Sequence, residues 1–175
     1  MKRCMPITVL GLAFAMPACS PTLDWREVRP SGAGLVTLFP CKPASQTRQL
    51  VLAGAAVEMA LFACAAGGAT YAVGVADMGQ PQRVEHALVE LVAAAARNIG
   101  AAAAPSATPV RVEGMTPNPQ ALRHAFAGRL GNGQPVQETV AVFARGTRVF
   151  QATVVGARLD GDAVETFFGA LRLPR

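Results

Sequence analysis

The fold is decided by residues 69–100, which read ATYAVGVADMGQPQRVEHALVELVAAAARNIG. Residues 69–77 alternate larger apolar side chains with small ones, a pattern typical of a strand. From Pro81, which suits a first helical turn, apolar residues recur at helical spacing as far as Gly100, which fits a helix end. We therefore expect one strand followed by one long helix, and we expect the small face of the strand to let a helix approach closely.

Short strands joined by tight turns are predicted on both sides of this stretch. Ala53-Gly54, Gly67-Gly68 and Asn132-Gly133 are turn signals, so the sheet is expected to be mostly antiparallel. Asp162 and Glu165 have the spacing of a capping box and predict a short closing helix to about residue 170. The pattern indicates an α+β fold, a mostly antiparallel sheet covered by one long and one short helix. The predicted strands are residues 35–39, 46–52, 55–64, 69–77, 110–112, 121–130, 136–144 and 148–156.

Residues 1–19, MKRCMPITVLGLAFAMPAC, have the form of an export signal. A basic start precedes an apolar run that is shorter than the roughly 20 residues needed to cross a bilayer as a helix. The last four residues, Met16-Pro17-Ala18-Cys19, resemble the lipobox of bacterial lipoproteins, although Met16 stands where Leu is usual. The resemblance implies that residues 1–18 are removed and that the Cys19 thiol carries diacylglycerol. The alternatives are cleavage before Met16, as in an ordinary secreted protein, and a retained helical anchor.

Residues 19–34 are polar and contain several Pro and Gly residues, so they are predicted to be a lipidated tether in front of a domain over residues 35–175. Because Ser20 rather than Asp follows Cys19, resemblance to lipoprotein sorting signals implies anchoring at the outer membrane, facing the periplasm. A soluble periplasmic or secreted form is the alternative. Trp25 lies in an alternating segment of this tether, where it either contacts a partner or packs on the domain's own surface.

Two cysteines, Cys41 and Cys64, remain after Cys4 leaves with the signal and Cys19 takes the lipid. In an oxidising compartment such a pair is most simply a disulfide. Two free buried thiols are the alternative. No metal site is expected, because the chain has no C-x-x-C and neither His is near these cysteines in sequence.

Four short segments, in this order, resemble the PsbP-like superfamily, which includes many small bacterial envelope proteins. They are residues 38–43 (LFPCKP), 71–77 (YAVGVAD), 148–152 (RVFQA) and 167–173 (FFGALRL). The resemblance implies an antiparallel sheet between helices. It implies no enzyme and no functional residue.

The sequence contains few candidates for catalytic or ligand-binding residues. His86 lies one helical turn before Glu90, which is a common surface pairing, and His124 alternates with apolar residues in its strand. No Ser lies in a G-x-S-x-G motif, and no Gly-rich segment has the context of a phosphate loop. No cofactor is expected. Arg123 and Arg129 fall on one face of their strand, where they either contact an anionic partner or add scattered solubilising charge.

Composition and charge reduce the number of function classes that fit the chain. The chain has 175 residues, is 51% hydrophobic and 15% charged, and has a mean hydropathy of +0.32, values that indicate a compact globule rather than disorder. Without the export segment, 14 basic and 11 acidic residues remain, and they show no cluster of the kind that binds nucleic acid. The leading hypothesis is a non-catalytic envelope module that binds a protein partner or assists assembly. The alternatives are a carrier with a small-ligand pocket between sheet and helix, and an enzyme with an unrecognised site.

Overall fold

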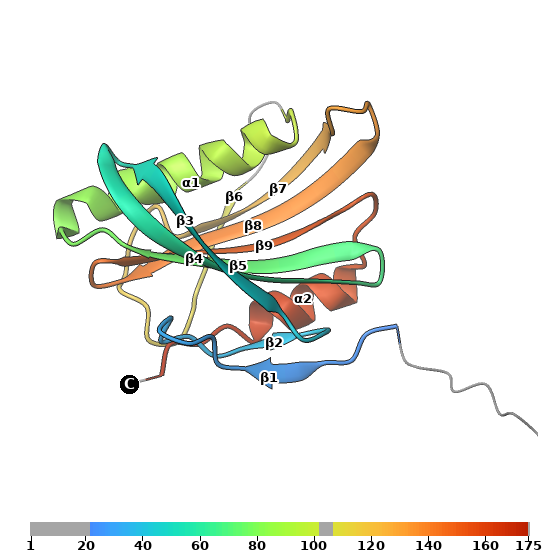
Figure 1. Cartoon of the computed structure of the whole chain (residues 1–175), viewed down its shortest axis with the longest axis horizontal. Helices are drawn as coiled ribbons and strands as arrows, with labels where there is room; N and C mark the ends of the chain where they lie inside the picture. The colour runs from blue at the N-terminus through green and yellow to red at the C-terminus, as the bar shows by residue number, and fades with distance from the viewer. Residues whose placement is uncertain (1–21, 102–106, 175) are drawn as a thin grey trace, which may run out of the picture.

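A computed structural model of the chain describes residues 22–101 and 107–174 (Figure 1). Seven strands form one sheet in the order β3-β4-β5-β9-β8-β7-β6, and two short strands form a second sheet. Every strand pairing is antiparallel. The strands are β1 (Arg26–Val28), β2 (Thr37–Phe39), β3 (Ala44–Leu52), β4 (Ala55–Ala66), β5 (Ala69–Asp77), β6 (Ala107–Pro109), β7 (Leu122–Arg129), β8 (Pro135–Arg145) and β9 (Arg148–Gly156). The helices are η1 (Pro81–Arg83), α1 (Val84–Asn98) and α2 (Gly161–Gly169). The predicted α+β class is confirmed.

Two glycine-containing turns hold the first three strands of the large sheet together. At Ala53-Gly54 both residues have positive φ, 49° and 70°. Gly67 and Gly68 have φ of 59° and 78°. Positive φ at both central positions is the two-residue hairpin turn whose twist matches that of the flanking strands. Both predicted turns are therefore confirmed.

Two separate apolar clusters lie on the two faces of the sheet, because alternate residues of each strand point to opposite sides. On β8, Val140 and Val142 face one cluster and Phe143 faces the other, and all three are fully buried. Helix α1 covers the first face, while α2 and the β1-β2 pair lie on the opposite side (Figure 1). The described chain is thus a layered structure with the sheet in the middle.

The predicted capping box was wrong: the short helix α2 begins two residues before the start that the box implied. Asp160 is the N-cap, and its Oδ1 accepts hydrogen bonds from the amides of Asp162 (2.9 Å) and Ala163 (3.1 Å). Glu165 bonds Arg123 instead. Asp160 adopts an extended backbone, as an N-cap requires, whereas Asp162 already lies in the first turn.

The predicted strand at residues 110–112 was also wrong. The edge strand next to β7 is β6, residues 107–109, and Val110 to Val112 lie in the loop that follows it. Local β propensity at Val110-Arg111-Val112 did not decide the pairing, because strand formation depends on the neighbouring strand as much as on the residue types.

Residues 22–34, which make up most of the predicted tether at 19–34, have a structure of their own. β1 pairs with β2, and the Asp24 amide donates to the Pro40 carbonyl at 2.9 Å. Leu23, Trp25 and Val28 pack against the α2-side cluster. The apolar side chains of this alternating segment find a surface there, so the folded unit extends before Leu35, the expected domain start.

A disulfide joins Cys41, just after β2, to Cys64 on β4, with an S–S distance of 2.13 Å and a Cα–Cα distance of 6.0 Å. The predicted pairing is confirmed. It connects the small N-terminal sheet to the large sheet across 23 residues of sequence. Such a cross-link restricts the unfolded chain and stabilises the docked arrangement.

Candidate functional site

A cleft of about 450 Å³ lies between α1 and the large sheet. Its floor includes Ala72 and Gly74, on the small face of β5. The expectation that a helix would lie closely on this small face was wrong, since α1 packs mainly on β8 and β9. The side chains of Met59 and Leu61 approach Gly74 instead: a Cβ there would be 3.2 Å and 3.0 Å from their nearest atoms. The small residues leave room for the cleft.

Glu138 on β8 is the feature of the cleft that sequence reasoning missed. It is 5% exposed, and it lies opposite Phe126 of β7 and Val155 of β9. Within the described ranges no hydrogen bond or ion pair reaches its carboxylate. Burial raises the pKa of Glu138 from 4.5 to about 7. A carboxyl group in this position is half-protonated near neutral pH and lacks a partner for its charged form.

A signal for Glu138 was present in the sequence. Residues 136, 138, 140 and 142 share one face of β8, and all except Glu138 are Val. An acidic residue within a continuous apolar stripe predicts either a buried partner or a binding site. The prediction of a strand over residues 136–144 already placed Glu138 on that face.

Other polar groups line the same cleft. Gln151 and Thr153 lie on β9, and Gln151 Nε2 donates to Thr153 Oγ1 at 3.4 Å. Arg97 and Asn98 reach it from the last turn of α1, and Arg48 reaches it from β3. The apolar part of the lining comes from Leu50, Met59, Leu61 and Leu91. The cleft thus combines an apolar wall with a small number of polar groups, as ligand pockets do.

Glu90 fixes one end of the cleft. Its Oε2 accepts a hydrogen bond from the Ala53 amide at 2.7 Å, which ties α1 to the β3–β4 hairpin. The expected surface pairing of His86 with Glu90 is not present among the hydrogen bonds of the described residues. At the C-terminal end of α1, the Ile99 carbonyl accepts from the Arg129 amide at 2.8 Å. The helix above the cleft is therefore held near its middle and at its C-terminal end.

The residues predicted for partner contact are engaged within the domain. Trp25 is half-buried and packs edge-on against Tyr71, with ring centroids 5.9 Å apart. Arg123 bonds both carboxylate oxygens of Glu165, at 3.0 Å and 2.7 Å, and lies 4.5 Å above the Phe168 ring. Arg129 donates to the Gly133 carbonyl at 2.9 Å.

Arg123 and Arg129 do not form one surface. They are six positions apart on β7, about 20 Å along a strand, and each has its own partner. Cys19, the predicted lipidation site, lies outside the described residues.

Arg145 and Arg148, which flank the β8–β9 turn, hold the C-terminal tail and the segment between β1 and β2. Arg145 donates to the carbonyls of Leu173 (3.2 Å) and Pro174 (2.7 Å). Arg148 donates to the Gly32 carbonyl at 3.3 Å. Their fork-shaped side chains are therefore used for internal backbone contacts.

His124 is the more enclosed of the two histidines. It stacks on Phe126 with centroids 5.8 Å apart, and its Nδ1 is buried without a hydrogen-bond partner. Burial lowers the pKa of His124, so the ring is neutral at physiological pH. His86 is exposed on α1. Neither has a nucleophile and an orienting partner around it in the described structure.

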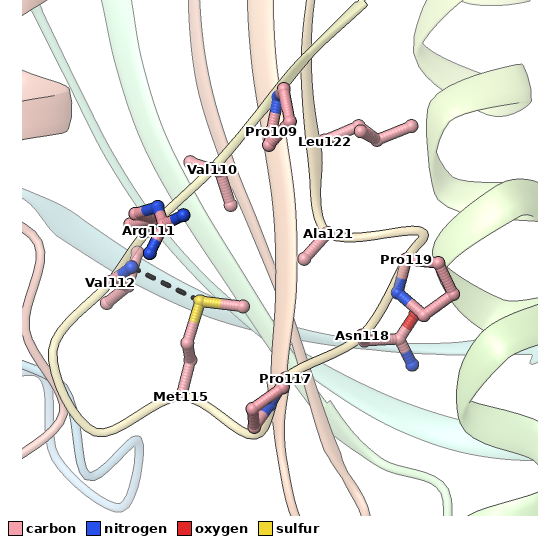
Figure 2. Close-up of a pocket in the computed structure, with 10 residues that line it drawn as sticks. All are labelled: Pro109, Val110, Arg111, Val112, Met115, Pro117, Asn118, Pro119, Ala121 and Leu122. Carbon is pink, nitrogen blue, oxygen red and sulfur yellow. Dashed lines mark hydrogen bonds between the residues drawn. The ribbon is translucent and has the colours of Figure 1, made fainter.

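A second hollow, of about 460 Å³, lies within the loop between β6 and β7. Figure 2 shows its lining, which includes Pro109, Pro117 and Pro119. Met115 folds back over the loop, and its Sδ accepts a hydrogen bond from the Val112 amide at 3.2 Å (Figure 2). Arg111 is its only titratable lining residue among those described. The hollow therefore has few polar or titratable groups that could bind or react with a ligand.

Within the described ranges, no group of three or more His, Cys, Asp or Glu residues is placed to hold a metal ion. No described helix has the length and apolar character to span a bilayer. No protein-family model matches the chain, and no curated protein matches it significantly.

Proposed function

We propose that this chain is a lipid-anchored, non-catalytic binding protein of the bacterial cell envelope that holds a small ligand in the cleft between α1 and the sheet. The observation that carries the binding role is Glu138, a residue only 5% exposed that lines a cleft of about 450 Å³ and whose carboxyl group has no partner among the described residues. Buried carboxyl groups are normally paired, so an unpaired one in a cleft favours a ligand as the partner.

The anchor rests on the N-terminal sequence. Met16-Pro17-Ala18-Cys19 resembles a lipobox, and Ser20 favours the outer membrane. The Cys41–Cys64 disulfide supports an oxidising compartment, because such bonds persist outside the cytosol. The antiparallel sheet between two helices supports the PsbP-like resemblance at the level of layers.

The cleft favours a ligand carrier over the protein-binding module that was the first expectation. Trp25, Arg123 and Arg129 all have partners within the domain, which leaves those side chains little capacity for an external partner. A catalytic role has weaker support still, because a lone carboxyl group without a paired nucleophile does not make a catalytic constellation.

Metabolic labelling with a palmitate analogue tests the anchor. We expect label on the wild-type chain and none on Cys19→Ala. A wild-type chain that takes no label would exclude the lipid and leave cleavage before Met16 or a retained helical anchor.

Ligand-observed NMR with a fragment library tests the cleft, using the full chain in nonionic detergent and a detergent-only blank. Ala93 and Ala94 are adjacent and half-buried on α1, but only Ala94 lines the cleft. Leucine is also a good helix former, so both substitutions should preserve α1. We expect Ala94→Leu to remove fragment binding and Ala93→Leu to retain it. Equal binding by both variants would place the ligand elsewhere.

A further inference from the structure

We infer that the cleft selects a small organic cation, an amine with an apolar body, whose ammonium group pairs with Glu138. This inference rests on the proposed binding role and specifies its ligand class. The described protein supplies Glu138 with no cation of its own. An ammonium group within hydrogen-bond distance would satisfy the carboxylate and offset its desolvation.

The polar groups that the sheet contributes to the cleft fit an ammonium donor better than an acceptor. An ammonium carries three N–H donors and accepts nothing. Glu138 provides carboxylate oxygens. Gln151, four positions along β9 from the residue opposite Glu138, uses its amide nitrogen for Thr153 and retains its carbonyl oxygen as an acceptor. A carboxylate ligand would instead face Glu138 with like charge.

The rest of the cleft fits an apolar body. Met59, Leu61 and Leu91 form the apolar wall, and Ala72 leaves the floor open. A volume of about 450 Å³ lies within the range of small-molecule pockets, roughly 300–1,000 Å³. The amine therefore needs an apolar group large enough to cover this wall.

The other charges around the cleft do not replace the ligand. Arg48 of β3 and Arg97 of α1 are exposed at its margin, so water and salt screen their repulsion of a cation. Glu90 of α1 is used by the Ala53 amide. His124, two positions from Phe126 on β7, is kept neutral by burial, which lowers its pKa. Glu138 is thus the group whose protonation controls binding.

Isothermal titration with benzylamine, benzyl alcohol and benzoate tests the charge preference, because the three probes share one ring. The full chain is used in nonionic detergent with a detergent-only blank. We expect benzylamine to bind at least about tenfold more tightly than benzoate at about pH 8. Because the pKa of Glu138 is about 7, benzylamine should bind about tenfold more weakly at about pH 6, where a proton occupies the carboxylate.

Three variants assign the effect. Glu138→Gln keeps the side-chain shape and should remove both the preference for amine and its pH dependence. Glu85→Gln removes an exposed carboxylate of α1 and should change neither. Arg97→Gln should strengthen the binding of benzylamine slightly, if Arg97 only repels the cation from the margin of the cleft.

Three results would overturn the inference. They are tighter binding of benzoate than of benzylamine, amine binding that Glu138→Gln leaves unchanged, and a large loss of the pH dependence in Arg97→Gln, which would make Arg97 the partner of Glu138. If benzyl alcohol binds in an Ala94-dependent way while benzylamine shows no advantage, the cleft still binds ligands and only the cation preference fails. If no probe and no library fragment binds, the proposed function fails as well.

Discussion

At the scale of single residues, Glu138 is the point where this protein departs from the usual rule that buried acids are paired. Its neighbours along the same face of β8 are apolar, and its desolvation is not offset by any bond within the described structure. The free protein therefore carries an energetic cost that depends on pH.

Glu138→Gln should change how stability depends on pH. Burial raises the folded-state pKa from 4.5 to about 7, so between these values the folded protein holds a proton that the unfolded chain has lost. The free energy of unfolding of the wild type, relative to that of the variant, should therefore fall by up to about 3 kcal/mol as pH rises through this window. Above the window the difference should stay constant. Denaturant unfolding at several pH values measures the difference, with Glu85→Gln as control. Parallel wild-type and Glu138→Gln profiles would contradict it.

Asp160→Ala should cost about 1 kcal/mol of stability, because Asp160 caps two amides at the start of α2. Asp162→Ala is the matched control. It removes only a favourable charge in the first turn, worth about 0.5 kcal/mol. Thermal or denaturant unfolding of the two variants gives the comparison. An equal or larger loss in Asp162→Ala would favour the capping box that the sequence suggested.

At the scale of elements, the contact between β7 and the end of α1 depends on a glycine. A Cβ on Gly128 would lie 2.1 Å from the Ile99 carbonyl oxygen. That oxygen already accepts the Arg129 amide at 2.8 Å, so the backbone has little freedom to move. The close contact between Gly128 and Ile99 therefore fixes the position of α1 and, with it, one end of the cleft.

Gly128→Ala should therefore destabilise the protein by at least about 2 kcal/mol, as overpacking against backbone does. Gly131→Ala, in the adjacent hairpin, meets nothing within 4 Å and should change stability by less than about 0.5 kcal/mol. Unfolding midpoints in denaturant compare the two. Near-equal midpoints would show that α1 and β7 separate easily.

Local patterns predicted most elements, and the failures have physical causes. The strand at 148–156, the long helix and the glycine turns all depend on short-range signals, and all are confirmed. The strand at 110–112 failed because pairing with β7, not local propensity, selects residues 107–109. The cleft could not be predicted from the sequence, because it depends on how α1 packs over the sheet. The acidic residue at position 138, within an apolar stripe, could have been recognised.

At the scale of the whole molecule, long-range bonds hold the N-terminal segment and the C-terminal tail to the sheet. Glu27 of β1 pairs with Arg172 near the C-terminus, and hydrogen bonds from Arg29, then Arg172, lower the pKa of Glu27. Val36 and Arg172 exchange backbone hydrogen bonds at 2.9 Å and 3.0 Å. The two ends of the described chain thus stabilise each other.

Reduction of the Cys41–Cys64 disulfide should cost about 3 kcal/mol, in line with a loop closed across 23 residues. Hydrogen exchange should then speed up first in β1 and β2, which the bond connects to β4. Unfolding with and without reductant, followed by exchange mass spectrometry, measures both effects. Alkylation of Cys41 and Cys64 themselves in the unreduced protein would contradict the bond itself.

The docking of residues 22–34 has a consequence for how the protein would be oriented at a bilayer. If Cys19 carries the lipid, only three peptide units separate it from Thr22, where the described structure begins, and covalent geometry limits that span to roughly 11 Å. The end of the sheet that bears the β4–β5 turn must then lie near the headgroups, because Thr22 and Leu23 lie beside Gly67 of that turn. Helix α1 covers the opposite face of the sheet from β1 and α2 (Figure 1), so the lipid attaches on the side away from the cleft and leaves the cleft open to molecules that diffuse through the compartment.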